Sequence, residues 1–588
     1  MPLSRSLRRP FREHAPCRAC AFIIALLLPL LITTQASAQA AATTDDQPSV
    51  IRGTVVNRLT GAAIPRALVF SPDSRYAMFT DGDGHFSFTI PRDETAASAN
   101  NGKSNGSISL FARVGGVRRA SNLFMARKPG FLDDHRSQRR AEVSADGELT
   151  ISLSPESLIK GRITSATGEP VAAANIQLFA RQIQDGLPRW NPRGSARSNS
   201  AGEFRFADLE SGTYKLATSE WMDNDPLTSI PGGPKFGSPP VYFPNAADSA
   251  AAGAIELSAG QIFQADLSLS RQRYFDVKIP IANEEFEGGL MVKVEGQRGP
   301  GYSLGYNTNT RKIEGWLPDG SYTLRASTFG AGSATGTLGI KVNGAPVTGP
   351  AMGLIRNGTI GLNVKEDFRP EQYPSEATWS DGTHSFSYRG PRLYLNVWAE
   401  PADEVDTTRA GSVRPPMRDN DDSLVIENLP PGRYWLHLDP SRGYAESATS
   451  GGVDVLHQPV VVGPGSNLTV DVQMRDDFAE IDGTLSAVSS PAAAAMDSSS
   501  GPAAWVYCIP LADSAGRFEQ IPVFSEGKFS ANTIPPGDYL LLAFSTRQPN
   551  LPYRDPEAMS AWQSKGQVVH VTAGQKTSVQ LQNILTGD

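Results

Sequence analysis

The sequence predicts an all-β protein, a tandem array of about five β-sandwich modules after a cleaved leader. Three observations support this fold class. One phrase recurs four times at a nearly constant spacing, and apolar and polar residues alternate after its copies as they do in strands. Helical periodicity is almost absent, and the best candidate for a short helix lies at 555–565.

The recurring phrase is Leu-x-x-Gly-x-Tyr-x-Leu, with Ile as the first residue of the last copy. Its copies are spaced by 108, 112 and 105 residues and begin at Leu209, Leu317, Leu429 and Ile534. A period near 108 is too long for a solenoid turn and fits a whole sandwich domain. The Gly permits a tight turn, and the Tyr is the first inward residue of the next strand. This spacing resembles the tyrosine corner, whose ring packs in the core while its hydroxyl bonds to the backbone at the turn.

Three further phrases mark the modules. Ile-x-Gly-x followed by Val, Ile or Leu opens three of them, at Ile51, Ile159 and Ile481. A Gly-x-Phe phrase follows, at Gly84, Gly202 and Gly527. A Gly with an apolar residue seven positions later closes modules, at Gly260, Gly465 and Gly574. These phrases indicate hairpin turns and the strands that follow them.

Together with Gly-x-Pro-Val-x-x-Ala at 168–174, these phrases resemble the carboxypeptidase regulatory-like family. The resemblance is strongest over 49–92 and 156–217 and weaker in modules three and four, which lack the opening phrase. In module one a Ser/Asn/Ala/Gly-rich stretch stands where the Tyr turn is expected. The resemblance implies an Ig-like or transthyretin-like sandwich of seven strands, often grouped with starch-binding-like folds, on exported bacterial proteins. It implies no reaction and covers no peptidase domain.

The phrases predict a signal peptide and five modules, at 1–38, 49–155, 156–270, 271–366, 367–475 and 476–588. Low-complexity stretches at 93–107 and 486–504 indicate loops inside modules. A Pro/Gly-rich stretch at 225–244 indicates a long excursion that could pack on a neighbouring module.

The first residues have the order of a secretory signal. A basic segment precedes an apolar run from Ala21 to Ile32, and Ala36-Ser37-Ala38 has the spacing that signal peptidase recognises. The run is too short to span a bilayer comfortably, although an uncleaved anchor is the alternative. We expect the mature chain to begin near Gln39, with no later transmembrane segment, and to be extracytoplasmic: periplasmic, on the outer surface or secreted.

Charge and cysteine content narrow the function classes. The net charge is −7 at pH 7, and removal of the Arg-rich leader makes the chain more acidic. This argues against nucleic acid and anionic membranes as partners. Cys508 is the only cysteine beyond the leader, so we expect no internal disulfide.

The candidate catalytic and metal motifs are weak. Gly-x-Ser-x-Gly at 301–305 matches a nucleophile elbow, but its surroundings indicate a β-hairpin and not the strand–turn–helix that an elbow needs. No histidine is followed three residues later by Glu, as a zinc carboxypeptidase would need. The Asp-rich stretches at 81–85, 223–225 and 419–422 suit turn formation better than calcium binding. We therefore predict no enzyme, no cofactor and no metal.

Four aromatic residues form the candidate ligand site. Alternation along two strands predicts outward side chains at Tyr394, Trp398, Trp435 and His437. If these strands share a sheet, the four form a patch suited to stacking on sugar rings or to docking another module. Docking or plain cross-strand pairing is the preferred interpretation.

Three functional hypotheses follow. The preferred one is an exported, non-enzymatic scaffold or adhesion protein whose partner is a cell-envelope glycan or another envelope protein. The alternative is a carbohydrate-binding protein that uses the outward aromatics. The remote alternative is an unrecognised hydrolase.

Overall fold

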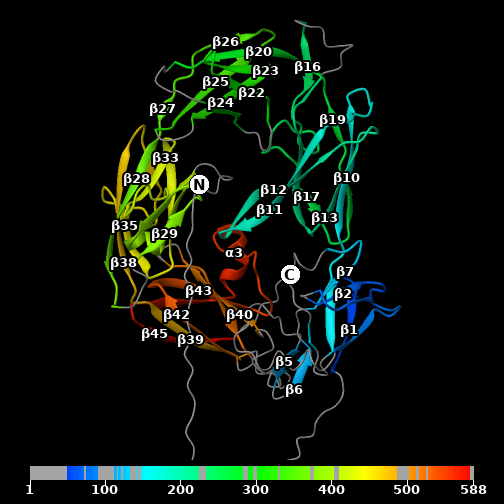
Figure 1. Cartoon of the computed structure of the whole chain (residues 1–588), viewed down its shortest axis with the longest axis vertical. Helices are drawn as coiled ribbons and strands as arrows, with labels where there is room; N and C mark the ends of the chain where they lie inside the picture. The colour runs from blue at the N-terminus through cyan, green and yellow to red at the C-terminus, as the bar shows by residue number, and fades with distance from the viewer. Residues whose placement is uncertain are drawn as a thin grey trace, which may run out of the picture. The chain divides into compact units, whose positions relative to one another are not determined.

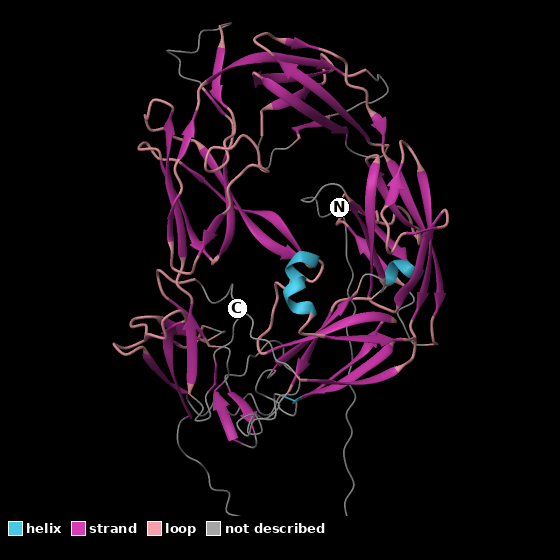
Figure 2. Cartoon of the chain, turned by 180° about the vertical axis from the view of Figure 1, so that it is seen from behind, coloured by secondary structure: helices cyan, strands magenta, loops and turns pink. Residues whose placement is uncertain are grey.

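The computed structural model confirms the all-β prediction (Figures 1 and 2). It describes residues 49–71, 74–90, 111–114, 117–120, 124–132, 142–143, 148–223, 233–282, 289–295, 301–328, 332–370, 376–402, 410–486, 502, 504–511, 516–524 and 527–582. The expected leader and the low-complexity stretch at 93–107 lie outside these residues, as does most of the stretch at 486–504. Among the described residues, no helix combines the length and the hydrophobicity that a membrane crossing requires.

One topological feature recurs five times along the described chain. In each group of strands, a long strand at or near the start pairs in parallel with a strand at or near the end. The pairs are β1 (Ser49–Asn57) with β9 (Leu149–Leu153), β10 (Ser157–Ser165) with β18 (Ile262–Gln264) and β19 (Leu267–Leu269), β20 (Gln272–Pro280) with β26 (Val347–Thr348), β28 (Gly358–Asp367) with β38 (Asn467–Arg475), and β39 (Ala479–Leu485) with β45 (Lys576–Leu581).

Each of these groups consists of two sheets, which we call sheet pairs 1 to 5. In sheet pair 1 the orders are β4 (His85–Ile90)-β1-β9-β8 (Glu142–Val143) and β3 (Ala77–Phe79)-β2 (Leu68–Phe70)-β7 (Met125–Arg127). In sheet pair 2 they are β13 (Glu203–Leu209)-β10-β18 and β12 (Leu187–Arg197)-β11 (Asn175–Gln184)-β14 (Gly212–Thr218)-β17 (Ile255–Leu257). In sheet pair 3 they are β15 (Trp221–Met222)-β16 (Lys235–Ser238)-β20-β23 (Lys312–Pro318)-β22 (Leu304–Asn307) and β21 (Leu290–Val294)-β24 (Gly320–Thr328)-β25 (Ala334–Val342)-β27 (Ile355–Arg356).

The last two sheet pairs follow the same plan. Sheet pair 4 has the orders β33 (Leu424–Leu429)-β28-β38-β35 (Tyr444–Ser450)-β36 (Val453–Asp454) and β32 (Gly411–Ser412)-β31 (Leu395–Pro401)-β34 (Gly432–Pro440)-β37 (Val460–Val462). Sheet pair 5 has β42 (Lys528–Ile534)-β39-β45 and β41 (Glu519–Val523)-β40 (Ala504–Pro510)-β43 (Gly537–Phe544)-β44 (Gln567–Val571). Two hairpins lie outside these sheets, β5 (Phe111–Val114)-β6 (Val117–Ala120) and β29 (Ala377–Ser380)-β30 (Ser385–Tyr388).

Each sheet pair encloses its own hydrophobic cluster, drawn from both of its sheets. The one α-helix of the described residues, α3 (Pro556–Gln563), lies where the sequence predicts a helix. Asp555 caps it, because its side chain accepts hydrogen bonds from the backbone N–H groups of Glu557 and Ala558. Met559 packs with Leu540 and other outer-face residues of β40 and β43, so this face of the sheet is also buried.

The opening phrase and the Gly-x-Phe phrase meet inside the core. In sheet pair 2, Gly161 pairs across the strands with Phe204. A Cβ atom on Gly161 would lie 2.7 Å from the Phe204 ring and 1.9 Å from the carbonyl oxygen of Ala265. The same crowding recurs between Gly53 and Phe86 and between Gly483 and Phe529. The opening phrase therefore needs Gly because a Phe ring and a neighbouring backbone occupy the space of a side chain.

The recurring tyrosine forms the predicted corner in all four copies. Each hydroxyl donates to the carbonyl oxygen four residues earlier, at 2.9 Å for Tyr214, 3.0 Å for Tyr322, 2.6 Å for Tyr434 and 2.7 Å for Tyr539. The rings of Tyr214, Tyr434 and Tyr539 are buried, whereas that of Tyr322 is half-buried. The phrase is thus structural, since ring and hydroxyl both stabilise the turn-to-strand junction.

Two strand pairings cross predicted module boundaries. Part of the Pro/Gly-rich excursion forms β16, which pairs with β20 beyond the boundary at 270. β28, most of which precedes the boundary at 366, belongs to a sheet of pair 4. The module limits themselves stay predictions.

Candidate functional site

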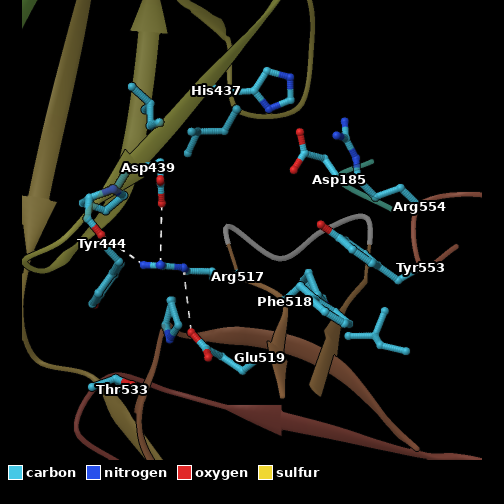
Figure 3. A pocket seen from close by; sticks show the side chains of 18 of the residues that line it. Asp185, His437, Asp439, Tyr444, Arg517, Phe518, Glu519, Thr533, Tyr553 and Arg554 are labelled. Carbon is cyan, nitrogen blue, oxygen red and sulfur yellow. Dashed lines mark hydrogen bonds and ion pairs between the residues drawn. The ribbon is translucent and has the colours of Figure 1, made fainter. Parts of the chain in front are cut away.

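A cleft of about 1500 Å³ is lined by three of the four aromatic residues that the sequence singles out. Figure 3 shows the cleft with one of them, His437, labelled. The cleft is lined by β31, β34, the segment 516–519, the segment 553–563 and the tip of the hairpin that joins β11 to β12. Trp398, Trp435 and His437 belong to this lining, and Tyr394 does not.

β31 and β34 share a sheet, as the aromatic patch requires. They pair antiparallel, with Trp398 opposite His437 and Glu400 opposite Trp435. The indole of Trp398 and the imidazole of His437 lie parallel, with centroids 5.1 Å apart and planes at 8°. Both rings are half-buried and lie on the face that points away from the core. Each ring thus covers one face of the other.

The expected outward position of Tyr394 is wrong. This side chain is only 5% exposed and belongs to the core cluster of sheet pair 4. Its hydroxyl donates to Glu366 at 2.9 Å, and its ring packs edge-on against Phe368. A 3₁₀ turn, η1 (Gly390–Leu393), precedes β31, so the strand alternation begins only at Leu395 and does not extend back to Tyr394.

A buried ion pair lies beside the stacked rings. Glu400 follows Trp398 on the outward face of β31, and its side chain is 8% exposed because Arg189 of β12 covers it. The guanidinium of Arg189, 4% exposed, donates to one oxygen of Glu400. The other oxygen lies 2.7 Å from Nε2 of His437. Three polar groups from two sheet pairs therefore meet away from water.

These partners determine the charge state of Glu400. Burial alone raises its pKa, but hydrogen bonds from His437 and Arg189 outweigh burial and hold the pKa below its ordinary value of 4.5. A carboxyl whose folded pKa is lowered contributes stability at neutral pH. That contribution is lost as the pH falls from about 4.5 through the folded pKa.

The tip of the β11–β12 hairpin touches residues just before α3. Asp185 and Gly186 form its two-residue turn, both with positive φ, as a type I′ turn requires. The backbone N–H of Arg554 donates to the carbonyl of Gly186 at 3.1 Å. A Cβ atom on Gly186 would lie 2.7 Å from the ring of Tyr553.

The remaining rings and charges of the cleft also contact each other. The ring of Tyr553 stacks on Phe518 with centroids 4.0 Å apart. Arg517 lies 3.6 Å from Asp439 and 3.8 Å from Glu519 (Figure 3). Burial raises the pKa of Glu519, although Arg517 opposes this shift. The lining of the cleft therefore contains both aromatic rings and charged side chains, and these groups contact one another.

The weak catalytic and metal motifs have structural roles. Ser303 of the elbow-like phrase donates its backbone N–H to Glu220 at 2.9 Å, and β22 after it forms the predicted hairpin with β23. Asp81 accepts backbone N–H groups of Asp83 and His85 within its turn, and Asp421 pairs with Arg414. Over the described part of the chain, no group of three His, Cys, Asp or Glu side chains could hold a metal ion.

Comparison with known proteins identifies one domain. Residues 158–220 match the carboxypeptidase regulatory-like domain. They lie in sheet pair 2, where the opening phrase, the Gly-x-Phe phrase and the tyrosine corner all occur. No curated protein matches the chain in sequence.

Three solved structures illustrate the wider structural similarity. The TIE protein of Bacillus anthracis is 10% identical over 72% of this chain and 73% of its own, with a TM-score of 0.13. A streptococcal ancillary pilin is 10% identical over 52% of this chain and 99% of its own, with a TM-score of 0.17. The major pilin subunit of Bacillus cereus is 11% identical over 54% of this chain and 100% of its own, with a TM-score of 0.12.

Sequence reasoning missed Arg189, Glu400 and Tyr553. Glu400 carries only the pattern of an outward strand residue, which normally indicates exposure. Its partner Arg189 stands 211 positions away, and no phrase links the two. An Asp-Gly pair between two β-rich runs was the one available signal, because it predicts a hairpin turn at 185–186.

Proposed function

We propose that this chain is an exported, non-enzymatic scaffold or adhesion protein of the cell envelope or extracellular space. The observation that carries the proposal is that hydrogen bonds cross each boundary between the predicted modules 2 to 5. Within one chain, domains move relative to each other by default unless their interface is extensive. Bonds between modules would hold the binding surfaces of a scaffold in fixed positions, whereas modules without such bonds would move independently.

The bonds differ in kind at each junction. β16 adds a strand from the predicted second module to the sheet of β20. Between sheet pairs 3 and 4, the amide of Asn357 donates to the Ser333 hydroxyl at 2.7 Å and to the Asn428 carbonyl at 3.2 Å. Hydrogen bonds between neutral polar groups contribute about 1 kcal/mol each and fix orientation.

The junction between sheet pairs 4 and 5 uses charge. The hydroxyl of Tyr444 donates to Asp477 at 2.7 Å, and Arg475 forms an ion pair with the same carboxylate. Arg517, just before β41 of sheet pair 5, also lies 3.6 Å from Asp439 of β34 in sheet pair 4. These contacts support a chain whose parts hold a defined geometry, which suits a structural role.

The side-chain roles around the cleft also favour a scaffold over an enzyme. Glu400 and His437 are paired with each other and with Arg189, and Arg517 lies between two carboxylates. A general acid or base must be free to reach a substrate. The charged groups named here contact one another.

Carbohydrate binding remains the second candidate, because Trp435 lines the cleft on the outward face of β34. Sugar recognition needs an accessible aromatic face. Trp398 and His437 each have one face against the other, so the candidate rests mainly on Trp435.

Pull-down from the cell envelope with the purified mature protein tests the proposal. We expect capture of a discrete envelope protein, equally well by the wild type and by Trp435→Ala. Specific binding to a glycan array that Trp435→Ala abolishes would instead establish the carbohydrate-binding candidate. Capture of nothing by the wild type, with no glycan bound, would contradict both.

A further inference from the structure

The β11–β12 hairpin extends beyond its own sheet. β11 and β12 pair from Asn175–Arg197 to Gln184–Leu187, whereas β14 supports β11 only from Ile176 to Ala180. The residues from Arg181 to Arg189 thus form a two-stranded arm, none of which belongs to a hydrophobic cluster of sheet pair 2. A two-stranded ribbon alone is only marginally stable in water, so the arm depends on what it contacts.

The arm contacts two other sheet pairs. Near its base, Arg189 donates to the buried Glu400 of β31. At its tip, Gly186 accepts from the backbone N–H of Arg554 and lies against the ring of Tyr553. Gly186 and Arg189 are three positions apart in the chain, or about 10 Å in a strand, so both contacts belong to one short element.

We propose that the arm 181–189 is a releasable clasp, which closes on β31 and on the segment 553–554 and opens as a unit. Opening would expose Glu400 and the ring of Tyr553 to solvent while every hydrophobic core stays folded.

Two physical arguments support release. A buried ion pair has high specificity but contributes little net stability, because both ions regain hydration when they separate. Among the described residues, the tip contacts only the short segment 553–554, through a backbone hydrogen bond and a glycine–ring contact, which is a small intrachain interface. The clasp therefore closes in a single arrangement and opens at small cost.

Hydrogen exchange of the full mature chain tests the clasp, read from peptides that span Tyr553–Asp555. Gly186→Ala places a methyl group against Tyr553 and should raise the exchange rate there at least about tenfold, which corresponds to about 1.4 kcal/mol. Gly168→Ala is the matched control. Gly168 has a similar φ of +86° against +75°, but nothing lies within 4 Å of its Cβ position, so exchange at 553–555 should not change.

Glu400→Gln tests whether the arm opens as a unit, because Arg189 at the base is the part of the arm that it affects. We expect faster exchange at 553–555 in this variant as well, with the protection of β31 and β34 retained. The clasp would be overturned if Gly186→Ala and Gly168→Ala exchanged alike at 553–555. It would equally be overturned if Glu400→Gln left exchange there unchanged, or if it removed protection throughout sheet pair 4.

Discussion

Tyr539→Ala should lower the free energy of unfolding of the fragment 476–588 by about 3–5 kcal/mol. The Tyr539 ring is fully buried in the core of sheet pair 5, and its removal leaves a cavity that the two sheets cannot close. Tyr539→Phe keeps the ring and loses only the hydrogen bond to Pro535, so it should cost about 1 kcal/mol. Denaturant unfolding of the three proteins gives both values.

The four corners provide an internal comparison. Alanine at Tyr214 or Tyr434 should cost nearly as much as at Tyr539, since all three rings are buried. The half-buried Tyr322 should cost less, because less apolar area is lost. An unchanged unfolding midpoint for Tyr539→Ala would contradict the structural role of the recurring tyrosine. It would indicate instead that this residue contacts a ligand.

Gly161→Ala should lower the free energy of unfolding of sheet pair 2 by about 3 kcal/mol or more, which is the upper end of the usual cost of adding a methyl group to a packed core. The new methyl group would lie 1.9 Å from the carbonyl oxygen of Ala265, and a backbone atom held in a sheet cannot move aside as a side chain can. Thermal unfolding of the full chain measures the effect.

Gly361→Ala is the control for this substitution. Gly361 occupies β28, which opens sheet pair 4 as β10 opens sheet pair 2, yet the nearest atom to its Cβ position is the carbonyl oxygen of Leu468 at 3.8 Å. Alanine there should change stability by less than about 0.5 kcal/mol. Equal effects at the two positions would show that crowding against Phe204 and Ala265 does not explain the opening phrase.

Local pattern was enough to predict the fold class and the tyrosine corner. Turn glycines and strand alternation act over a few residues, so a phrase such as that around Tyr214 specifies its own turn and strand. The meeting of Gly161 with Phe204 was not predicted, although both phrases were recognised, because register between strands is a property of the folded sheet. The contact of Glu400 with Arg189 was not predicted either, because it joins side chains 211 positions apart that only the folded chain brings together.

The candidate site was predicted in part. Trp398, Trp435 and His437 lie together because β31 and β34 are neighbours, which the sequence analysis stated only as a condition. Tyr394 was misplaced because η1, which begins at the Gly390-Pro391 pair, interrupts the strand before Leu395. A single turn of 3₁₀ helix changes which face a side chain joins, so alternation cannot be extended across it.

The bonding between the predicted modules 2 and 3 is most directly tested by denaturant unfolding of the fragment 156–270 against the fragment 156–357. The shorter fragment keeps the core of sheet pair 2 but lacks β20, the strand to which β16 is hydrogen-bonded. Because β16 has its partner strand β20 only in the longer fragment, we expect the unfolding midpoint of sheet pair 2 to be higher there. Identical midpoints would contradict this claim, because they would show that the predicted modules 2 and 3 unfold independently of each other.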